Sequence, residues 1–383
     1  MKTIGSLALA MGLLASATAG AETLKIGVVA PQTGPGAAWG FALDAGARIA
    51  AAEANEKGGL TVDGKTYQVE VITYDDQYKA AETVTAVNRL IHQDGVRFIV
   101  GPLGAASLLA VKPITEPAEV LMMSNTYTVK ALEDSEYIFR VLPTSREFVP
   151  PFVAWLRENR PELKKVGLLA PNDETGWDSQ AVQREAYEAN GFEVAAAELF
   201  ERKQNDFRAI LTKLLAAEPD TIELDTTPPP LAGLIIRQAR ELGFTGQFTK
   251  FGGVNVTEIV EAAGAENAEG LLGYLGADPA SKEWEWLETQ YGKFHPNRMG
   301  DFTFFFYDAS KILFAGIEKA GTVEDTTRVR DAIEQASPFE TLIGKSHWGG
   351  ADVYGIDHQL FTPTFLVEIA EGKGRVIQKL DAN

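Results

Sequence analysis

LKIGVVAPQTGPGAAWG, residues 24–40, combines a strand pattern with the loop that follows it. The apolar run at 24–30 is typical of a buried strand, and 31–40 is rich in the glycine and proline that form loops. A helical pattern follows at 41–55, where apolar residues recur every three to four positions, and it ends at Gly58-Gly59. A strand, a loop and a helix in this order predict a unit of an α/β fold with a parallel sheet.

The same alternation of strand and helix continues along most of the chain. In its first part, strand patterns lie at 69–74, 96–100 and 120–123, and helical patterns lie at 80–92 and 105–118. The alternation restarts after Arg140, with strand patterns at 166–170, 192–199, 221–224 and 247–251 and helical patterns at 148–159, 180–190, 207–217 and 231–242. Each run has about the length of one domain, so we predict an α/β fold with two doubly wound parallel-sheet lobes.

The third section of the chain is more helical. Helical patterns lie at 282–291, 301–320 and 326–335, and a last strand pattern lies at 365–369. The second of these helices begins in an aromatic cluster, DFTFFFYD at 301–308. A dense aromatic stripe of this kind predicts core packing.

The first 21 residues have the features of a secretory signal peptide. Met1-Lys2 supplies a positive start, an uncharged stretch follows at 4–17, and small residues offer cleavage after Ala19 or Ala21. The uncharged stretch is too short to cross a bilayer as a stable helix. We therefore expect cleavage after about residue 21 and a mature protein in the periplasm.

Composition narrows the possible partners. The chain has no cysteine, so lipid attachment at a cysteine is excluded and a freely soluble periplasmic protein is favoured. Its formal net charge of −18 becomes one unit more negative when Lys2 is removed with the signal peptide. Such an acidic surface repels nucleic acid and anionic lipid headgroups. We expect a monomer with a small-molecule ligand.

The residues that would signal an enzyme, a metal site or a nucleotide cofactor are absent or wrongly spaced. The four histidines, His92, His295, His347 and His358, lie far apart, and we expect each at the surface or in a loop. The chain has no Gly-x-Ser-x-Gly elbow. The loop after the first strand has Trp39 where a dinucleotide-binding loop needs a small residue. We therefore expect no cofactor, no metal and no enzymatic activity.

Six loops follow the predicted strands, and ligands of open parallel sheets bind at these carboxyl ends. The loops are 31–40, 101–107, 124–128, 172–177, 225–228 and 251–253. Backbone amides at the predicted helix start near Ala105 suit an anion, and Thr126 and Thr128 add hydroxyl groups. We expect Trp39 and Trp177 to face each other across the cleft, one from each lobe.

Several segments together resemble the type I periplasmic solute-binding proteins of the leucine/isoleucine/valine-binding family. They are KIGVVAPQTGPGAAWG (25–40), EANEKGG (53–59), YDDQ (74–77), VGPLGAAS (100–107) and RQARELGFTGQF (237–248). The resemblance implies two lobes that close on a ligand and deliver it to an ABC permease in the inner membrane. It places the three crossing segments near 142–146, 273–276 and 346–352. Lobe 1 is then 22–143 plus 276–346, and lobe 2 is 144–275 plus 347–383.

The amino-acid pocket of that family carries over only in part. Ala105 stands where the family has a serine, Thr175 stands where it has a tyrosine, and Gly252 stands near its acid for the ligand ammonium. A buried ammonium without a carboxylate is costly. Either Asp225 replaces that acid, or the ligand lacks an α-amino group. The resemblance and the loops together assign ligand contacts to Trp39, Leu103, Gly104, Ala105, Thr126, Tyr127, Thr128, Thr175, Trp177, Asp225, Phe251 and Gly252.

The resulting hypothesis is a periplasmic substrate-binding subunit of an ABC importer. Its ligand would be like a branched-chain amino acid, or an amide, or an organic or aromatic acid. A periplasmic ligand sensor of the same fold, serving a signalling partner, is the alternative. An exported hydrolase is a third possibility, but it would need a nucleophile and a base in one cleft.

Overall fold

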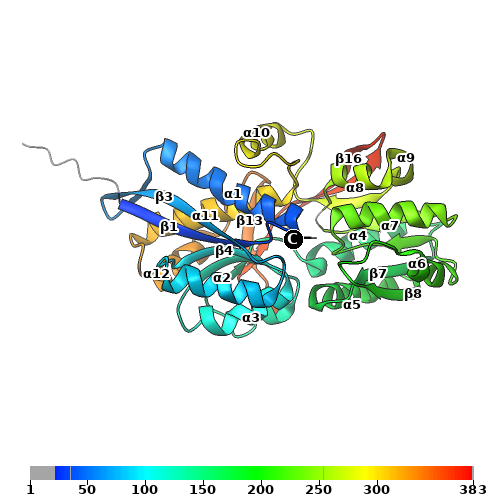
Figure 1. Cartoon of the computed structure of the whole chain (residues 1–383), viewed down its shortest axis with the longest axis horizontal. Helices are drawn as coiled ribbons and strands as arrows, with labels where there is room; N and C mark the ends of the chain where they lie inside the picture. Colours follow the sequence, from blue (N-terminus) through cyan, green and yellow to red (C-terminus); the bar gives the residue numbers. More distant parts are fainter. Residues whose placement is uncertain (1–21, 35, 253, 382–383) are drawn as a thin grey trace, which may run out of the picture.

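The computed structural model describes residues 22–34, 36–252 and 254–381, which form two α/β lobes (Figure 1). The predicted signal peptide lies outside the described residues. One lobe is built from residues 22–140 and 282–361, and the other lobe is built from residues 145–275 and the C-terminal strands at 364–380. The predicted fold of two lobes around separate sheets is confirmed.

Lobe 1 contains, within the described residues, a nine-stranded sheet in the order β12-β13-β14-β6-β5-β4-β1-β3-β2. Its strands are β1 (Glu22–Ala30), β2 (Leu60–Val62), β3 (Lys65–Asp75), β4 (Phe98–Leu103), β5 (Leu121–Asn125), β6 (Ile138–Arg140), β12 (Phe339–Glu340), β13 (Lys345–Gly349) and β14 (Gln359–Phe361). Its helices are α1 (Ala37–Glu56), α2 (Ala80–His92), α3 (Ala105–Thr115), η1 (Val129–Ala131), α10 (Lys282–Tyr291), α11 (Phe302–Ala320), α12 (Thr326–Glu334) and α13 (Ala351–Tyr354). The strands from β3 to β14 in this order pair in parallel, as the alternating pattern predicts.

Lobe 2 contains, again within the described residues, a seven-stranded sheet in the order β16-β15-β11-β10-β9-β7-β8. Its strands are β7 (Lys165–Pro171), β8 (Glu193–Phe200), β9 (Thr221–Glu223), β10 (Gln247–Lys250), β11 (Leu272–Leu275), β15 (Thr364–Ala370) and β16 (Lys373–Leu380). Its helices are α4 (Ser145–Asn159), α5 (Glu174–Ala189), α6 (Arg208–Leu215), α7 (Pro229–Glu241), α8 (Val256–Ala263) and α9 (Ala265–Ala268). The predicted last strand, β15, finds antiparallel partners in β11 and β16.

The chain passes between the two sheets three times, and the third passage differs from the expectation. The first two passages follow β6 and β11, close to the expected segments. β13 pairs with β14, and Gln359 of β14 pairs with Arg140 of β6. Both strands therefore belong to the sheet of lobe 1, and the chain leaves that lobe at 362–363 rather than near 346–352. The expectation that 347–361 belongs to lobe 2 is wrong.

Helices α1 and α11 pack closely in the core of lobe 1. Gly46 of α1 makes this approach possible, because a Cβ atom there would lie 2.6 Å from the amide nitrogen of Tyr307 and 2.8 Å from the carbonyl carbon of Phe306. Phe304, Phe305 and Phe306 are fully buried, which confirms core packing for most of the aromatic cluster. Burial of each such side chain contributes about 1.5–3 kcal/mol to folding. The helix is thereby fixed with its first turn at the cleft between the lobes.

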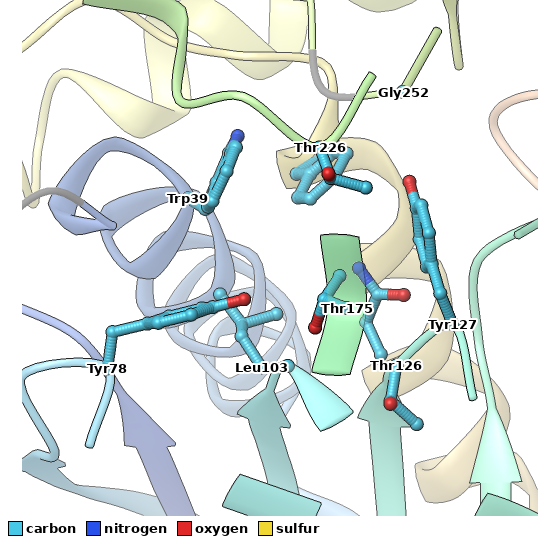
Figure 2. Close-up of a pocket in the computed structure, with 11 residues that line it drawn as sticks. Trp39, Tyr78, Leu103, Thr126, Tyr127, Thr175, Thr226 and Gly252 are labelled. Carbon is cyan, nitrogen blue, oxygen red and sulfur yellow. The ribbon is translucent and has the colours of Figure 1, made fainter. Parts of the chain in front are cut away.

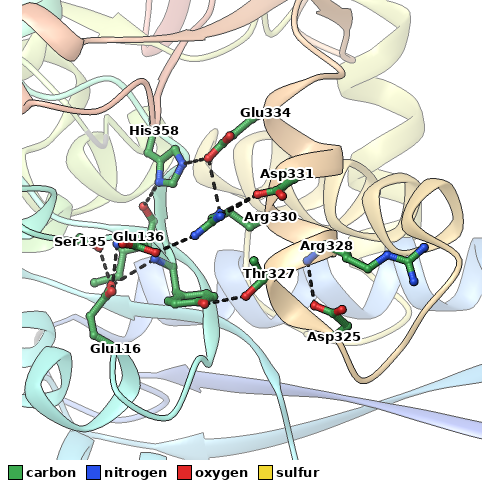
Figure 3. Close-up of polar contacts among 12 residues, drawn as sticks. Glu116, Ser135, Glu136, Asp325, Thr327, Arg328, Arg330, Asp331, Glu334 and His358 are labelled. Carbon is green, nitrogen blue, oxygen red and sulfur yellow. Dashed lines mark hydrogen bonds and ion pairs between the residues drawn. The ribbon is translucent and has the colours of Figure 1, made fainter.

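His358 lies in the loop between α13 and β14, as expected for a loop residue, but its side chain is fully buried. Its Nδ1 lies 3.0 Å from the carbonyl oxygen of Ile138, and its Nε2 lies 2.7 Å from Oε1 of Glu334 in α12 (Figure 3). Arg330 of the same helix also pairs with Glu136 over 2.8 Å. Because β14 pairs with β6, the adjacent His358 lies inside lobe 1. There both of its ring nitrogens have hydrogen-bond partners, as buried polar groups generally do.

None of the helices in the described part of the chain combines the length and the apolar character needed to cross a membrane.

Candidate ligand-binding site between the lobes

A cavity lies between the lobes at the carboxyl ends of their strands (Figure 2). Lobe 1 contributes most of its lining and lobe 2 contributes the rest. The lining residues are Trp39, Tyr78, Leu103, Gly104, Asn125, Thr126, Tyr127, Thr175, Thr226, Gly252 and Phe302. Seven of the twelve predicted contact residues therefore line one cavity: Trp39, Leu103, Gly104, Thr126, Tyr127, Thr175 and Gly252.

The parallel topology explains why residues so far apart in the sequence meet here. Leu103 and Asn125 are the last residues of β4 and β5, and Thr226 and Gly252 follow β9 and β10. Thr175 lies in the first turn of α5, which follows β7. All these positions are at the edge of an open α/β sheet where loops and helix N-termini converge.

Aromatic rings form one wall of the cavity. The Trp39 ring stacks on Phe302, with centroids 6.3 Å apart and planes 23° apart, and it lies 6.3 Å from the Tyr78 ring. Tyr127 stands on the other side in Figure 2, with its ring 6.0 Å from that of Phe148. Such walls suit a flat or apolar ligand body, because aromatic side chains provide large contact areas.

Four buried polar atoms of the lining lack a hydrogen-bond partner among the described residues. They are Trp39 Nε1, Asn125 Oδ1, Thr126 Oγ1 and Thr226 Oγ1. A buried polar group without a partner costs about 1–3 kcal/mol. The cavity therefore holds donors and acceptors that a ligand of matching polarity would satisfy.

The first turn of α3 reaches the cavity, but its first amide is used within the protein. Ala105 N donates to Thr175 Oγ1 over 3.1 Å and so connects the two lobes. Gly104 precedes it with φ +86°, and a Cβ atom there would lie 2.7 Å from the Tyr78 hydroxyl oxygen. Gly104 thus allows Tyr78 to lie against the helix start. The positive end of α3 remains at the cavity edge and favours a negative or carbonyl group.

Hydrogen bonds from neighbouring groups of lobe 2 occupy the carboxylate of Asp225, the residue that could replace the family acid. Its Oδ1 accepts from the Thr226 amide over 2.7 Å, and its Oδ2 accepts from Ser145 Oγ over 2.8 Å and from Ser179 Oγ. The side chain is fully buried and is not part of the cavity lining. The Asp225 carboxylate is therefore bound within lobe 2 and lies outside the cavity lining.

Buried charges next to Asp225 balance one another inside lobe 2. Lys250 Nζ donates to the Gly252 carbonyl oxygen over 2.7 Å. Burial lowers the pKa of Lys250 to about 8, and burial together with the charge of Asp225 raises the pKa of Glu223 to about 8. Burial also raises the pKa of Asp225. Lys250 thus supplies a positive charge close to both Asp225 and Glu223 within lobe 2.

Tyr127 fills the space beside Gly252. A Cβ atom on Gly252 would lie 2.4 Å from the Tyr127 hydroxyl oxygen, and Gly252 has φ +62°. A side chain at position 252 is therefore excluded in this closed arrangement. No described residue of the lining carries a charge.

The remaining predicted contacts lie elsewhere. Trp177 is 49% exposed, and its Nε1 donates to Asn172 Oδ1 over 3.0 Å, so the prediction that it faces Trp39 across the cleft is wrong. Thr128 is buried but is not part of the cavity lining, and its carbonyl oxygen accepts from Arg140 over 3.1 Å. Phe251 packs in the core, with its ring 4.2 Å from that of Phe152.

Four lining residues were not predicted from the sequence: Tyr78, Asn125, Thr226 and Phe302. Asn125 and Thr226 lie in two of the six loops, so the loop argument alone could have included them. Phe302 belongs to the aromatic cluster assigned to the core. Tyr78 directly follows the YDDQ segment, but no rule of spacing marks it.

The comparisons with known proteins agree with this arrangement. Residues 23–374 match the family described as periplasmic binding protein. The leucine-, isoleucine-, valine-, threonine- and alanine-binding protein of Pseudomonas aeruginosa is 30% identical over 343 residues, which cover 88% of each chain. The Leu/Ile/Val-binding protein of Escherichia coli is 24% identical and covers 93% of this chain and 94% of its own length.

Solved structures show the same fold. The branched-chain amino acid transporter substrate-binding protein LivJ from Streptococcus pneumoniae, in complex with isoleucine, has a TM-score of 0.81 at 24% identity and covers 94% of this chain and 99% of its own. A solute-binding protein of an ABC transporter from R. palustris, in complex with 4-hydroxybenzoate, has a TM-score of 0.79 at 20% identity, with 94% and 98% covered. The chain therefore belongs to the periplasmic binding proteins of type I, in the leucine/isoleucine/valine-binding family.

Proposed function

We propose that the protein is the periplasmic substrate-binding subunit of an ABC importer and captures a small solute between its closing lobes. The observation that carries the proposal is a cavity walled by both lobes, with unpartnered polar atoms in its lining. Closure by hinge bending would supply contacts that only the ligand-bound, closed state makes. The family and the similarity to transporter subunits support delivery to a permease in the inner membrane.

We further propose that the ligand lacks an α-ammonium group. Three features support this: the described lining is uncharged, Asp225 is already bound by Ser145 and Ser179, and Tyr127 fills the space beside Gly252. The aromatic wall favours a flat or apolar body, and the start of α3 favours a carboxylate or a carbonyl oxygen at one end. An aromatic or organic acid, or an amide, meets both requirements. Related structures hold either isoleucine or 4-hydroxybenzoate, so the fold accommodates both classes.

Calorimetry with matched ligand pairs tests this proposal. Each pair has the same carbon skeleton with and without the α-amino group: 4-methylpentanoate against leucine, and 3-phenylpropanoate against phenylalanine. Benzoate, 4-hydroxybenzoate and their amides extend the panel. We expect the member without the amino group to bind at least tenfold more tightly. A bound ligand at 100 times its Kd also raises the unfolding free energy by about 2.7 kcal/mol.

Two results would contradict the proposal. Micromolar or tighter binding of leucine, isoleucine or valine would reject the ligand class. A change in ligand mass after incubation with the protein would reject the receptor function in favour of an enzyme. Ligand transport into vesicles that carry a candidate ABC permease, if it depends on this protein, would support an importer subunit over a sensor.

A further inference from the structure

We propose that Arg202 is the positioning residue that holds the lobes closed over the cavity, an inference that rests on the proposed solute-binding function. Arg202 follows β8 in lobe 2 and is not part of the cavity lining. Its guanidinium carbon lies 4.9 Å from the centroid of the Tyr78 ring and 6.0 Å from that of Trp39, both in lobe 1. A guanidinium over aromatic rings at these distances is attracted by their π-electrons, most strongly when water is excluded.

Hydrogen bonds within lobe 2 fix the orientation of this guanidinium. Arg202 pairs with Asp173 through Nε and through Nη2, the latter 3.2 Å from Asp173 Oδ1. Its Nη1 donates to the carbonyl oxygen of Thr226 over 2.9 Å. The side chain is only 12% exposed. Because every one of these partners belongs to lobe 2, the guanidinium would keep its orientation when the lobes separate.

The partners of Arg202 also position cavity residues of lobe 2. Asp173 caps α5 by accepting from the Gly176 amide over 3.0 Å, and the first turn of that helix carries Thr175. Thr226, bound through its carbonyl, has φ +60°. A β-branched residue rarely adopts this conformation and keeps it only where its surroundings enforce it. Arg202 therefore helps to hold the Thr226 hydroxyl at the cavity.

Tyr78, on the opposite side, is held in a similarly unfavourable conformation. Its φ is +57° and that of Gln77 is +53°. Two neighbouring carboxylates stabilise this turn: Asp75 accepts from the Gln77 amide over 2.8 Å, and Asp76 accepts from the Tyr78 amide over 2.9 Å. Asp76 also accepts from Thr83 Oγ1 over 3.0 Å. The turn, held by these two carboxylates of lobe 1, thus presents the Tyr78 ring to Arg202 of lobe 2.

Arg202 consequently contacts two strained cavity residues, Thr226 in its own lobe and Tyr78 in the other. The contacts with Asp173 and Thr226 persist in any lobe arrangement, whereas those with Tyr78 and Trp39 exist only in the closed one. Only the contacts that differ between the two states shift the equilibrium between them. We infer that the contact of Arg202 with these rings sets the fraction of closed protein and the rate of ligand release.

Fluorescence energy transfer between the lobes tests this inference without a ligand. The chain has no cysteine, so Thr85→Cys in α2 and Arg237→Cys in α7 provide two unique exposed labelling sites. Arg202→Gln should shift the ligand-free population toward the open state. Arg208→Gln is the matched control: it removes another arginine of lobe 2, whose ion pairs among the described residues are with exposed carboxylates of that lobe, and it should leave the population unchanged.

Stopped-flow release of 4-hydroxybenzoate, or of the tightest ligand of the panel, gives the second measurement. We expect release about tenfold faster in Arg202→Gln, a partial effect in Arg202→Lys and none in Arg208→Gln. Unchanged populations and release rates in Arg202→Gln would overturn the inference. Failure of every panel ligand to bind would reject the proposed function alone, because the ligand-free measurement still decides the role of Arg202.

If Arg202→Gln does not fold, Tyr78→Leu tests the same contact from the side of lobe 1. It removes the nearer ring from lobe 1 and leaves the hydrogen bonds of Arg202 and its contact with Trp39 intact, so it should open the lobes to a smaller extent than Arg202→Gln. The double variant should then open no further than Arg202→Gln alone. Additive effects of the two substitutions would show that they act through separate contacts and would overturn the inference.

Discussion

The amide of Ala105 donates to Thr175 Oγ1 over 3.1 Å, so the first turn of α3 in lobe 1 is bound to the first turn of α5 in lobe 2. Both residues are buried, and both helices begin at the cavity edge. The bond forms only when the lobes are close together. It places a helix N-terminus, which favours negative charge, where a ligand is enclosed.

Thr175→Val should therefore weaken ligand binding. Loss of one neutral hydrogen bond costs about 1 kcal/mol, which corresponds to roughly fivefold in Kd. Thr175→Ser keeps the hydroxyl group and should bind nearly as well as the wild type. Calorimetry with the tightest ligand of the panel measures both. Equal affinities of the Val and Ser variants would show that the hydroxyl group is not used.

Gly252→Ala should hinder closure more than its backbone strain alone explains. The new Cβ atom would lie 2.4 Å from the Tyr127 hydroxyl oxygen, and φ is +62°. Gly191→Ala is the matched control, because Gly191 has φ +77° and a Cβ atom there would meet no other atom within 4 Å. We expect both variants to lose stability in urea unfolding, but only Gly252→Ala to lose ligand affinity. Wild-type affinity in Gly252→Ala would show that the new Cβ atom does not clash with Tyr127 in the ligand-bound state.

Asp225→Asn should destabilise the fold without changing which ligands bind. The substitution removes the charge near Lys250 and weakens the bonds from Ser145 and Ser179, at a cost of about 1–3 kcal/mol. Unfolding in urea measures the loss, and the matched ligand pairs measure selectivity. If Asp225→Asn abolished the binding of an α-amino acid, Asp225 would be its ammonium partner after all.

Asp308→Asn should change how stability depends on pH. Burial in α11 raises the pKa of Asp308 from 3.8 to about 7. Between about pH 4 and pH 7 the folded state then binds a proton that the unfolded state does not, so the unfolding free energy rises as the pH falls from 7 toward 4. The slope from one such group is at most about 1.4 kcal/mol per pH unit.

Urea unfolding at several pH values between 4 and 8 measures this slope. Asp308→Asn should reduce it, while Asp301 and Glu258, whose pKa burial likewise raises to about 7, keep a residual slope. Ser310→Ala in the same helix removes no titratable group and should retain the wild-type slope. An unchanged slope in Asp308→Asn would mean that Asp308 does not titrate in this range.

The pattern of apolar residues was sufficient to predict most helices and strands. Helices α2 and α10 begin and end at the predicted residues, because one face of each is apolar at helical spacing. The loops that follow the strands were also predictable, since every parallel strand must end at the same edge of its sheet. Seven of the predicted contacts line the cavity for this reason.

Only the tertiary structure decided which lobe the short strands join and which polar side chains face the cavity. β14 is three residues long, and its place beside β6 depends on a partner more than 200 residues away. Asp225 turns inward because Ser145, Ser179 and Lys250 lie below it. Arg202 meets Tyr78 only because two lobes close. Local sequence determines backbone periodicity, whereas the orientation of a buried charge depends on the distant groups that compensate it.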